Sequence, residues 1–173
     1  MIKKLVYTLA FITLAFSFGC STKSQYVKIN ESQNNCPSYF NIGEVVDSSN
    51  YVPGKDDPKI SPAVYMKNAL QKELIANSIY GKESKDVYTI QIEVLNYAPG
   101  NAFARWIMPG LGASKLNIQT TIVDCKGTPF ANIPIDRSVA AGGGYTIGAW
   151  EYVFVDVSER LVKDLKKNVL NMK

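Results

Sequence analysis

Histidine is absent from this chain of 173 residues, and its absence limits the chemistry that the side chains can perform. Without imidazole, Ser-His-Asp and Cys-His catalysis and His-ligated zinc or haem are excluded. Catalysis would need a pair of carboxylates or a serine activated by lysine. We therefore expect a protein that is not an enzyme and has no cofactor, because no telling spacing links the acids that could contribute: Asp47, Asp56, Asp57, Glu93 and Asp124.

The residues before Cys20 have the features of an export signal. Two lysines precede an apolar run over residues 5–18, which is shorter than the ~20 residues that a membrane-spanning helix needs. The run ends at Gly19, and this arrangement resembles the signal sequence of bacterial lipoproteins. In that family the cysteine thiol carries diacylglycerol and the new N-terminus is acylated with a fatty acid such as palmitate. Ser17 and Gly19 also suit ordinary signal peptidase, which would leave Cys20 as a plain thiol.

The resemblance implies a signal peptide over 1–19 and a lipid on Cys20. Similarity to the sorting rules of Gram-negative lipoproteins, which Ser21 satisfies because it is not aspartate, implies the outer membrane and a protein that faces the periplasm. The next residues are polar without sustained periodicity, so we interpret 20–37 as the lipidated N-terminus and a tether. Residues 38–173 then form a single periplasmic domain of ordinary size.

The remaining two cysteines, Cys36 and Cys125, predict a disulfide. An even pair of cysteines in an oxidising compartment is typically bridged. The bond would close a loop of ~90 residues and stabilise the fold by about 4–5 kcal/mol in the chain-entropy model. The alternative is a pair of buried free thiols. Two distant cysteines without histidine offer too few ligands for a metal, so no metal site is expected.

Composition and charge indicate one globular domain that does not bind nucleic acid. Hydrophobic residues make up 46% of the chain, which is too many for a disordered protein. The formal net charge of +4 is a mild excess without a dense basic run. Nucleic-acid binding is therefore not expected.

Alternating and helical periodicities predict four strands, at 39–47, 86–96, 115–124 and 130–139, and two helices, at about 62–80 and 148–171. Ser61 is a good N-cap before Pro62, and Gly81 stands where a C-terminal cap belongs. Pro134 inside the last strand implies an edge position or a bulge. A strand over 153–157, which is β-branched and aromatic, is the competing interpretation of the last helix.

The expected order β-α-β-β-β-α predicts the α+β class. Each alternating strand has one apolar and one polar face, which suits a sheet that is covered on one side. We predict a two-layer α/β sandwich, with a mainly antiparallel sheet of about four strands covered by two helices.

Segment 97–114 is unusually long and apolar for a connection between two strands. Long structured loops of this kind are often functional. One interpretation is a contact surface for a protein partner, for another copy of the chain or for the membrane surface. The other is that Trp106 and Leu111 fold back over the core. The side chains proposed for partner binding are Phe103, Arg105, Trp106, Ile107, Met108 and Leu111.

Several motifs occur in a fixed order along the chain: Arg105-Trp106, the glycine-rich run 110–116, Asp124 with Gly127, and the glycines 142–144 before a long final helix. In this order they resemble the DUF4410 family of bacterial lipoprotein domains of unknown function, over roughly residues 40–170. The resemblance implies a fold similar to small α/β periplasmic domains such as that of the curli secretion lipoprotein. It offers no catalytic residues to carry over. Cys125 and Pro109 depart from the family's pattern.

Three classes of function remain. The first is a non-enzymatic outer-membrane lipoprotein that is an assembly, accessory or scaffold component of an envelope complex. It would meet the membrane through its N-terminal lipid and would bind a protein partner or associate with itself. The second is a periplasmic lipoprotein that binds a small ligand, for which ten tyrosines are available. The third is an enzyme, which would need a polar cleft with two carboxylates.

Overall fold

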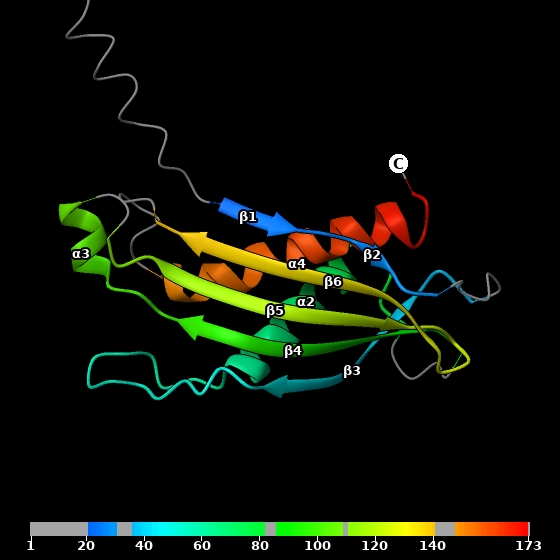
Figure 1. Ribbon diagram of the computed structural model, residues 1–173, viewed down its shortest axis with the longest axis horizontal. Helices are drawn as coiled ribbons and strands as arrows, with labels where there is room; N and C mark the ends of the chain where they lie inside the picture. Colours follow the sequence, from blue (N-terminus) through cyan, green and yellow to red (C-terminus); the bar gives the residue numbers. More distant parts are fainter. Residues whose placement is uncertain (1–20, 31–35, 82–85, 109–110, 141–147, 173) are drawn as a thin grey trace, which may run out of the picture.

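The protein is described by a computed structural model at residues 21–30, 36–81, 86–108, 111–140 and 148–172. Within these ranges it forms a six-stranded sheet and three helices (Figure 1). The elements in chain order are β1 (Ser21–Ser24), β2 (Val27–Lys28), β3 (Phe40–Asp47), α2 (Pro62–Ala76), β4 (Tyr88–Ala98), α3 (Ala102–Ile107), β5 (Ser114–Val123), β6 (Pro129–Val139) and α4 (Ala149–Asn168).

The sheet is mixed, which corrects the prediction of a mainly antiparallel sheet of about four strands. The strand order is β1-β6-β5-β4-β3, and β2 also pairs with β6. All neighbours are antiparallel except β3 and β4, which are parallel. The reason is the connection through α2, because a helical crossover returns the chain to the end of the sheet where it started. The order strand, helix, strand was predicted for these elements, but the parallel pairing of the two strands was not.

The segment interpreted as a tether contains β1 and β2, which is a second correction. β1 pairs antiparallel with β6 from Ser21, opposite Ser138, to Ser24, opposite Ile135. The residues of β1 and β2 are mostly polar because they lie at the edge of the sheet, where few side chains enter the core. Their backbone pairing with β6, rather than an apolar pattern, makes them strands.

One face of the sheet is covered by α2 and α4, and the core lies between these layers (Figure 1). Along β4, β5 and β6 buried side chains alternate with more exposed ones. The uncovered face is polar, with Gln91, Gln119 and Thr121 among its residues. The two-layer arrangement and the single covered face agree with the prediction.

The helix boundaries confirm one predicted cap and correct another. The Val64 backbone N–H donates to the Ser61 side chain, and Pro62 is the first residue of α2. The helix ends at Ala76 instead of reaching Gly81, because Ser78 adopts a positive φ of 56° and the following residues pair with Phe40. The last segment is helical from Ala149, so the competing strand is wrong.

Pro134 does not lie in an edge strand. It faces Gln119 of β5, and its carbonyl accepts from the backbone N–H of Gln25 on the other side. Gln25 lies in the break between β1 and β2. Because the nitrogen and the carbonyl of a strand residue point to the same side, the missing N–H of Pro134 faces this break, and the pairing with β5 is undisturbed.

Candidate functional site

The chain enters the sheet at the end that also bears the long connection between β4 and β5. Ser21 faces Ser138, Ser138 faces Lys115, and Lys115 faces Ala98, so these four residues form one row across four strands. We call the end of the sheet marked by this row the anchor end, because Ser21 directly follows Cys20. Figure 1 shows α3 projecting beyond the sheet at this end, where β1 begins and β4 ends.

The connection 99–113 contains α3, and we call its described residues, 99–108 and 111–113, the α3 projection. Asn101 is the N-cap of α3, and its side chain accepts from the Ala104 backbone N–H at 2.9 Å. The Asn101 backbone N–H donates to the Gly112 carbonyl at 2.8 Å and so closes the base. A Cβ on Gly112, whose φ is +62°, would lie 2.6 Å from the Asn101 carbonyl oxygen. Glycine is therefore required for this close approach.

The predicted contact residues of the α3 projection are largely exposed where the structure describes them. Exposed fractions are 67% for Phe103, 59% for Ile107, 55% for Met108 and 52% for Leu111. The alternative that Leu111 folds back over the core is therefore wrong. Arg105 and Trp106 belong to α3, and their side chains lie outside the described part of the structure, as does Cys20.

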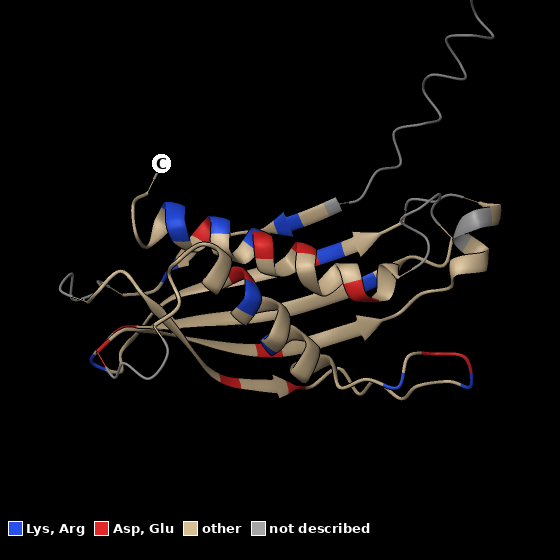
Figure 2. Ribbon diagram, turned by 180° about the vertical axis from the view of Figure 1, so that it is seen from behind, with Lys and Arg blue, Asp and Glu red and all other residues tan. Residues whose placement is uncertain are grey.

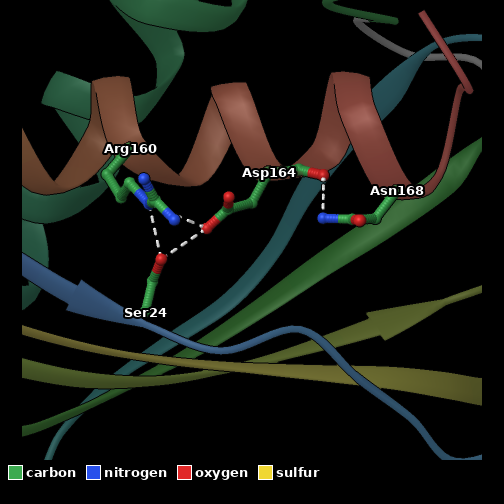
Figure 3. Close-up of polar contacts among 4 residues, drawn as sticks. All are labelled: Ser24, Arg160, Asp164 and Asn168. Atoms are coloured by element: carbon green, nitrogen blue, oxygen red, sulfur yellow. Dashed lines mark hydrogen bonds and ion pairs between the residues drawn. The ribbon is translucent and has the colours of Figure 1, made fainter.

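A buried carboxylate on α4 holds β1 against the helical layer (Figure 3). The Ser24 hydroxyl donates to Asp164 Oδ2 at 2.7 Å, and Arg160 Nε donates to the same oxygen at 3.1 Å. Asp164 is only 6% exposed. The Asn168 side chain donates to the Asp164 backbone carbonyl at 3.0 Å. The i,i+4 spacing of Arg160 and Asp164 could have suggested their ion pair, but no sequence signal linked them to Ser24.

A second ion pair joins β6 to α4 closer to the anchor end. Arg137 lies opposite Thr22 of β1, and its guanidinium donates to Asp156 of α4, with an Nε–Oδ2 distance of 2.9 Å. Arg137 is 7% exposed, so the pair is largely removed from water. Charges at such depth must be paired, because an isolated buried charge is costly. Sequence reasoning missed this pair, because its partners lie on different elements.

The opposite end of the sheet, the disulfide end, is closed by the predicted Cys36–Cys125 bond, with a Cα–Cα distance of 5.6 Å. The adjoining β5–β6 turn contains Asp124. Its Oδ1 accepts from the backbone N–H groups of Lys126 and Thr128, both at 2.9 Å. Asp124 thus sets the turn, as the sequence indicated.

Two adjoining hollows lie between α2 and α4. The larger one, of about 590 Å³, is at the C-terminal ends of both helices, and the smaller one, of about 430 Å³, is nearer their middle. Figure 2 shows acidic and basic residues at intervals along both helices. The larger hollow is lined by Glu73, Asn77, Glu159, Val162, Lys163, Lys166, Lys167, Asn171 and Met172.

An aromatic cluster packs beneath the loop that follows β3. The rings of Tyr51 and Tyr97 meet edge to face at 4.9 Å, and Tyr97 also packs on Phe154. The Tyr97 hydroxyl donates to the Trp150 carbonyl at 3.3 Å. Burial raises the pKa of Tyr97 far above its ordinary value of 10.0, and nearby Tyr51 and Asp57 raise this pKa further. Burial also raises the pKa of Tyr51.

Three of the other acids considered in the sequence accept hydrogen bonds from nearby residues. Asp47 accepts from Ser49, Asp57 accepts from the Gly54 backbone N–H, and Glu93 accepts from the Ser48 hydroxyl. In the described part of the chain, no group of three or more His, Cys, Asp and Glu side chains could hold a metal ion. None of the helices described here combines the length and the hydropathy needed to cross a membrane.

The chain belongs to the family described as "Domain of unknown function (DUF4410)", whose model matches residues 57–143. This agrees with the family resemblance found in the sequence. No curated protein matches the chain.

Solved structures to which the chain is similar include two PelC dodecamers from Paraburkholderia phytofirmans. Both are 10% identical to this chain, cover 82% of it and 97% of their own chain, and have TM-scores of 0.49 and 0.46. A minor lipoprotein from Acinetobacter baumannii is 17% identical over 64% of this chain and 89% of its own, with a TM-score of 0.41.

Proposed function

We propose that this protein is a non-enzymatic outer-membrane lipoprotein, anchored through a lipid on Cys20 and facing the periplasm. Its role would be that of an assembly, accessory or scaffold component of an envelope complex. The signal sequence before Cys20 supports the anchor. The structural roles of Asp124, Asp156 and Asp164, in a turn and in two ion pairs, support a role without catalysis.

The observation that carries this proposal is that no linker separates Cys20 from the first strand of the sheet. β1 begins at Ser21, the residue after the lipidated position. Its pairing with β6 and the contact of Ser24 with Asp164 hold the strand in place. A domain joined to its lipid in this way would stay close to the membrane in a restricted orientation. Such a restriction suits a component of a membrane-bound assembly better than a protein that must sample the periplasm.

The same orientation would present the helical layer to partners. α2 and α4 both run from the anchor end toward the disulfide end, so the larger hollow lies at the end of the domain remote from Cys20. Its rim carries both signs of charge, with Glu73 and Glu159 beside Lys163 and Lys166. A groove between two helices is a surface on which a helix or an extended segment of another protein can lie.

A linker insertion tests the proposal. A flexible Gly/Ser segment of about twelve residues, inserted between Cys20 and Ser21, would let the domain reach roughly 20 Å farther from the membrane. We expect this variant to remain in the outer-membrane fraction but to lose its place in a larger complex on native electrophoresis of gently solubilised envelopes. The matched control carries the same insertion after Lys55, in an exposed loop, and should keep the complex.

Two results would contradict the proposal. Cys20→Ser should move the protein to the soluble periplasmic fraction, and its retention in the membrane at the wild-type level would rule out the lipid anchor. Native migration of the wild type as a single chain, or a complex that survives the linker at Cys20, would rule out a role that depends on fixed placement.

The larger hollow between α2 and α4 favours a second candidate function, the binding of a small ligand. Its volume of about 590 Å³ lies within the usual range of ligand sites. Lys163, Lys166 and Lys167 would favour an anionic ligand. Thermal unfolding in the presence of a panel of small anions, compared between the wild type and Lys166→Gln, would test this function. Equal shifts in the two proteins would contradict it.

A further inference from the structure

The α3 projection combines large exposed apolar groups with an absence of negative charge. Its large apolar residues with described side chains are each more than half exposed: Phe103, Ile107, Met108 and Leu111. From Tyr97 to Ser114 the sequence contains no Asp or Glu, and Arg105 is the only basic residue. Aromatic and aliphatic side chains with positive charge are typical of segments that enter a membrane interface, where the headgroups are often anionic.

The position of the α3 projection relative to Cys20 favours the membrane over a protein as its partner. Ser21 and Lys115 lie two strands apart in the row across the anchor end, which corresponds to about 10 Å at the usual strand spacing. Lys115 is the second residue of β5, directly after the projection. A lipid on Cys20, one residue before Ser21, would therefore bring the bilayer to the end of the sheet from which α3 projects.

Both β1 and the base of the α3 projection are held by hydrogen bonds, so Ser21 and the projection stay close together. β1 is paired with β6 and held by Asp164, so the N-terminus cannot swing away without breaking these contacts. The base of the α3 projection is closed by the hydrogen bond between Asn101 and Gly112 and by the Asn101 cap. The exposed side chains are thus presented on a fixed support beside the lipid anchor, rather than on a free loop.

From this arrangement we infer that the α3 projection inserts its apolar side chains into the headgroup and upper acyl region of the bilayer, next to the lipid on Cys20. The inference rests on the proposed lipid anchor. Two attachments, one covalent and one through side chains, would set the orientation of the domain as well as its distance from the membrane. Membrane binding becomes more stable when a second contact is added to a lipid anchor.

The two tryptophans of the chain provide a matched test. Trp106 belongs to α3, whereas Trp150, near the same end of the molecule, packs edge-on against Tyr65 in the helical layer. The lipidated full-length mature chain would be purified as Trp150→Phe, with Trp106 alone, and as Trp106→Phe, with Trp150 alone. Each would be reconstituted into vesicles of phosphatidylethanolamine and phosphatidylglycerol with brominated acyl chains, and the quenching of tryptophan fluorescence would be measured.

We expect the emission of Trp106 to be strongly quenched in these vesicles and that of Trp150 to change far less, because bromine on an acyl chain quenches a tryptophan only at close range. Adding Leu111→Ser to the Trp106 protein should reduce the quenching. Ile75→Ser is the matched control, because Ile75 is equally exposed, at 54%, but lies on α2. Matching thermal unfolding curves would show that the variants remain folded.

The possible failures are distinguishable. Acyl chains on Cys20 by mass spectrometry, together with equal quenching of the two tryptophans, would overturn this inference and leave the anchor standing. A chain without acyl groups would overturn the anchor, and the inference with it. Unquenched Trp106 in a protein whose copies or partners cross-link less after Leu111→Ser would assign the α3 projection to a protein interface instead.

Discussion

The two connections that flank β5 both reverse the direction of the chain between antiparallel strands, but they differ in length and structure. At the disulfide end, residues 124–128 join β5 to β6, and Asp124 satisfies the turn with its own carboxylate. At the anchor end, residues 99–113 join β4 to β5 and include a helix. The short connection keeps its contacts within the fold, whereas the long one exposes apolar side chains such as Phe103.

The difference shows that one end of the sheet contributes mainly to stability, whereas the other end provides an exposed contact surface. The disulfide end carries a covalent cross-link and a turn in which the backbone N–H groups of Lys126, Gly127 and Thr128 donate to Asp124. The anchor end carries exposed side chains, which contribute little to the free energy of unfolding. We infer that substitutions at the first end act on the free energy of unfolding, and that those on the exposed surface of the second act on binding.

The largest expected effect comes from removing the cross-link. Cys36→Ala with Cys125→Ala, in the mature chain with Cys20→Ser, should lower the free energy of unfolding by about 4–5 kcal/mol, because the unfolded chain loses a loop closed by residues 89 apart. Urea denaturation of the two proteins measures the difference. A midpoint that does not move would show that the cross-link contributes nothing to stability.

Next in size is a pair of glycine substitutions, one in each connection. Gly112→Ala should destabilise the fold by about 2–3 kcal/mol, because the new methyl would clash with the Asn101 carbonyl in addition to the strain of a positive φ. Gly127→Ala should cost only about 1 kcal/mol, since no atom lies within 4 Å of the place its methyl would take and strain alone acts. Thermal or urea unfolding that ranks them in reverse would contradict the rigid base of the α3 projection.

A smaller effect should appear at alkaline pH. The pKa of Tyr97 is higher in the folded protein than its ordinary value of 10.0, so the folded state keeps this proton where the unfolded state loses it. Stability should therefore be unaffected below the ordinary pKa and should fall as the pH rises above it. Tyr97→Phe should flatten this fall in urea titrations at increasing pH, and an unchanged slope would contradict the assignment.

The smallest effect on stability is expected on the α3 projection itself. Phe103→Ser should change the free energy of unfolding by about 0.5 kcal/mol or less, because exposed side chains contribute little to folding.

Trp106→Ala tests the two interpretations of this segment directly. A buried core tryptophan would cost about 3–5 kcal/mol, whereas a contact residue should weaken membrane or partner binding with little loss of stability. Differential scanning calorimetry and vesicle flotation would be run side by side.

Much of the framework could be predicted because it depends on local patterns. Alternation along residues 86–96 and 115–124 predicted strands with one buried face, and the Ser61-Pro62 pair predicted the start of α2. The structure has these strands at 88–98 and 114–123. The disulfide was predicted from the number of cysteines in a chain that we expect to be exported. The exposed character of Leu111 was one of two open interpretations, because an apolar residue in a loop can face either the core or the solvent.

The strand pairing and long-range contacts that form the candidate site are decided by the tertiary structure. Residues 21–24 and 27–28 are strands because they pair with the backbone groups of β6, and no pattern of side chains in the sequence indicates this pairing. The contact of Ser24 with Asp164 joins positions 140 residues apart. By itself, the sequence determined that a lipid is expected at Cys20 and that an apolar segment follows β4. Only the folded sheet places these two at one end, because the strand register aligns Ser21 with Ala98 through two intervening strands.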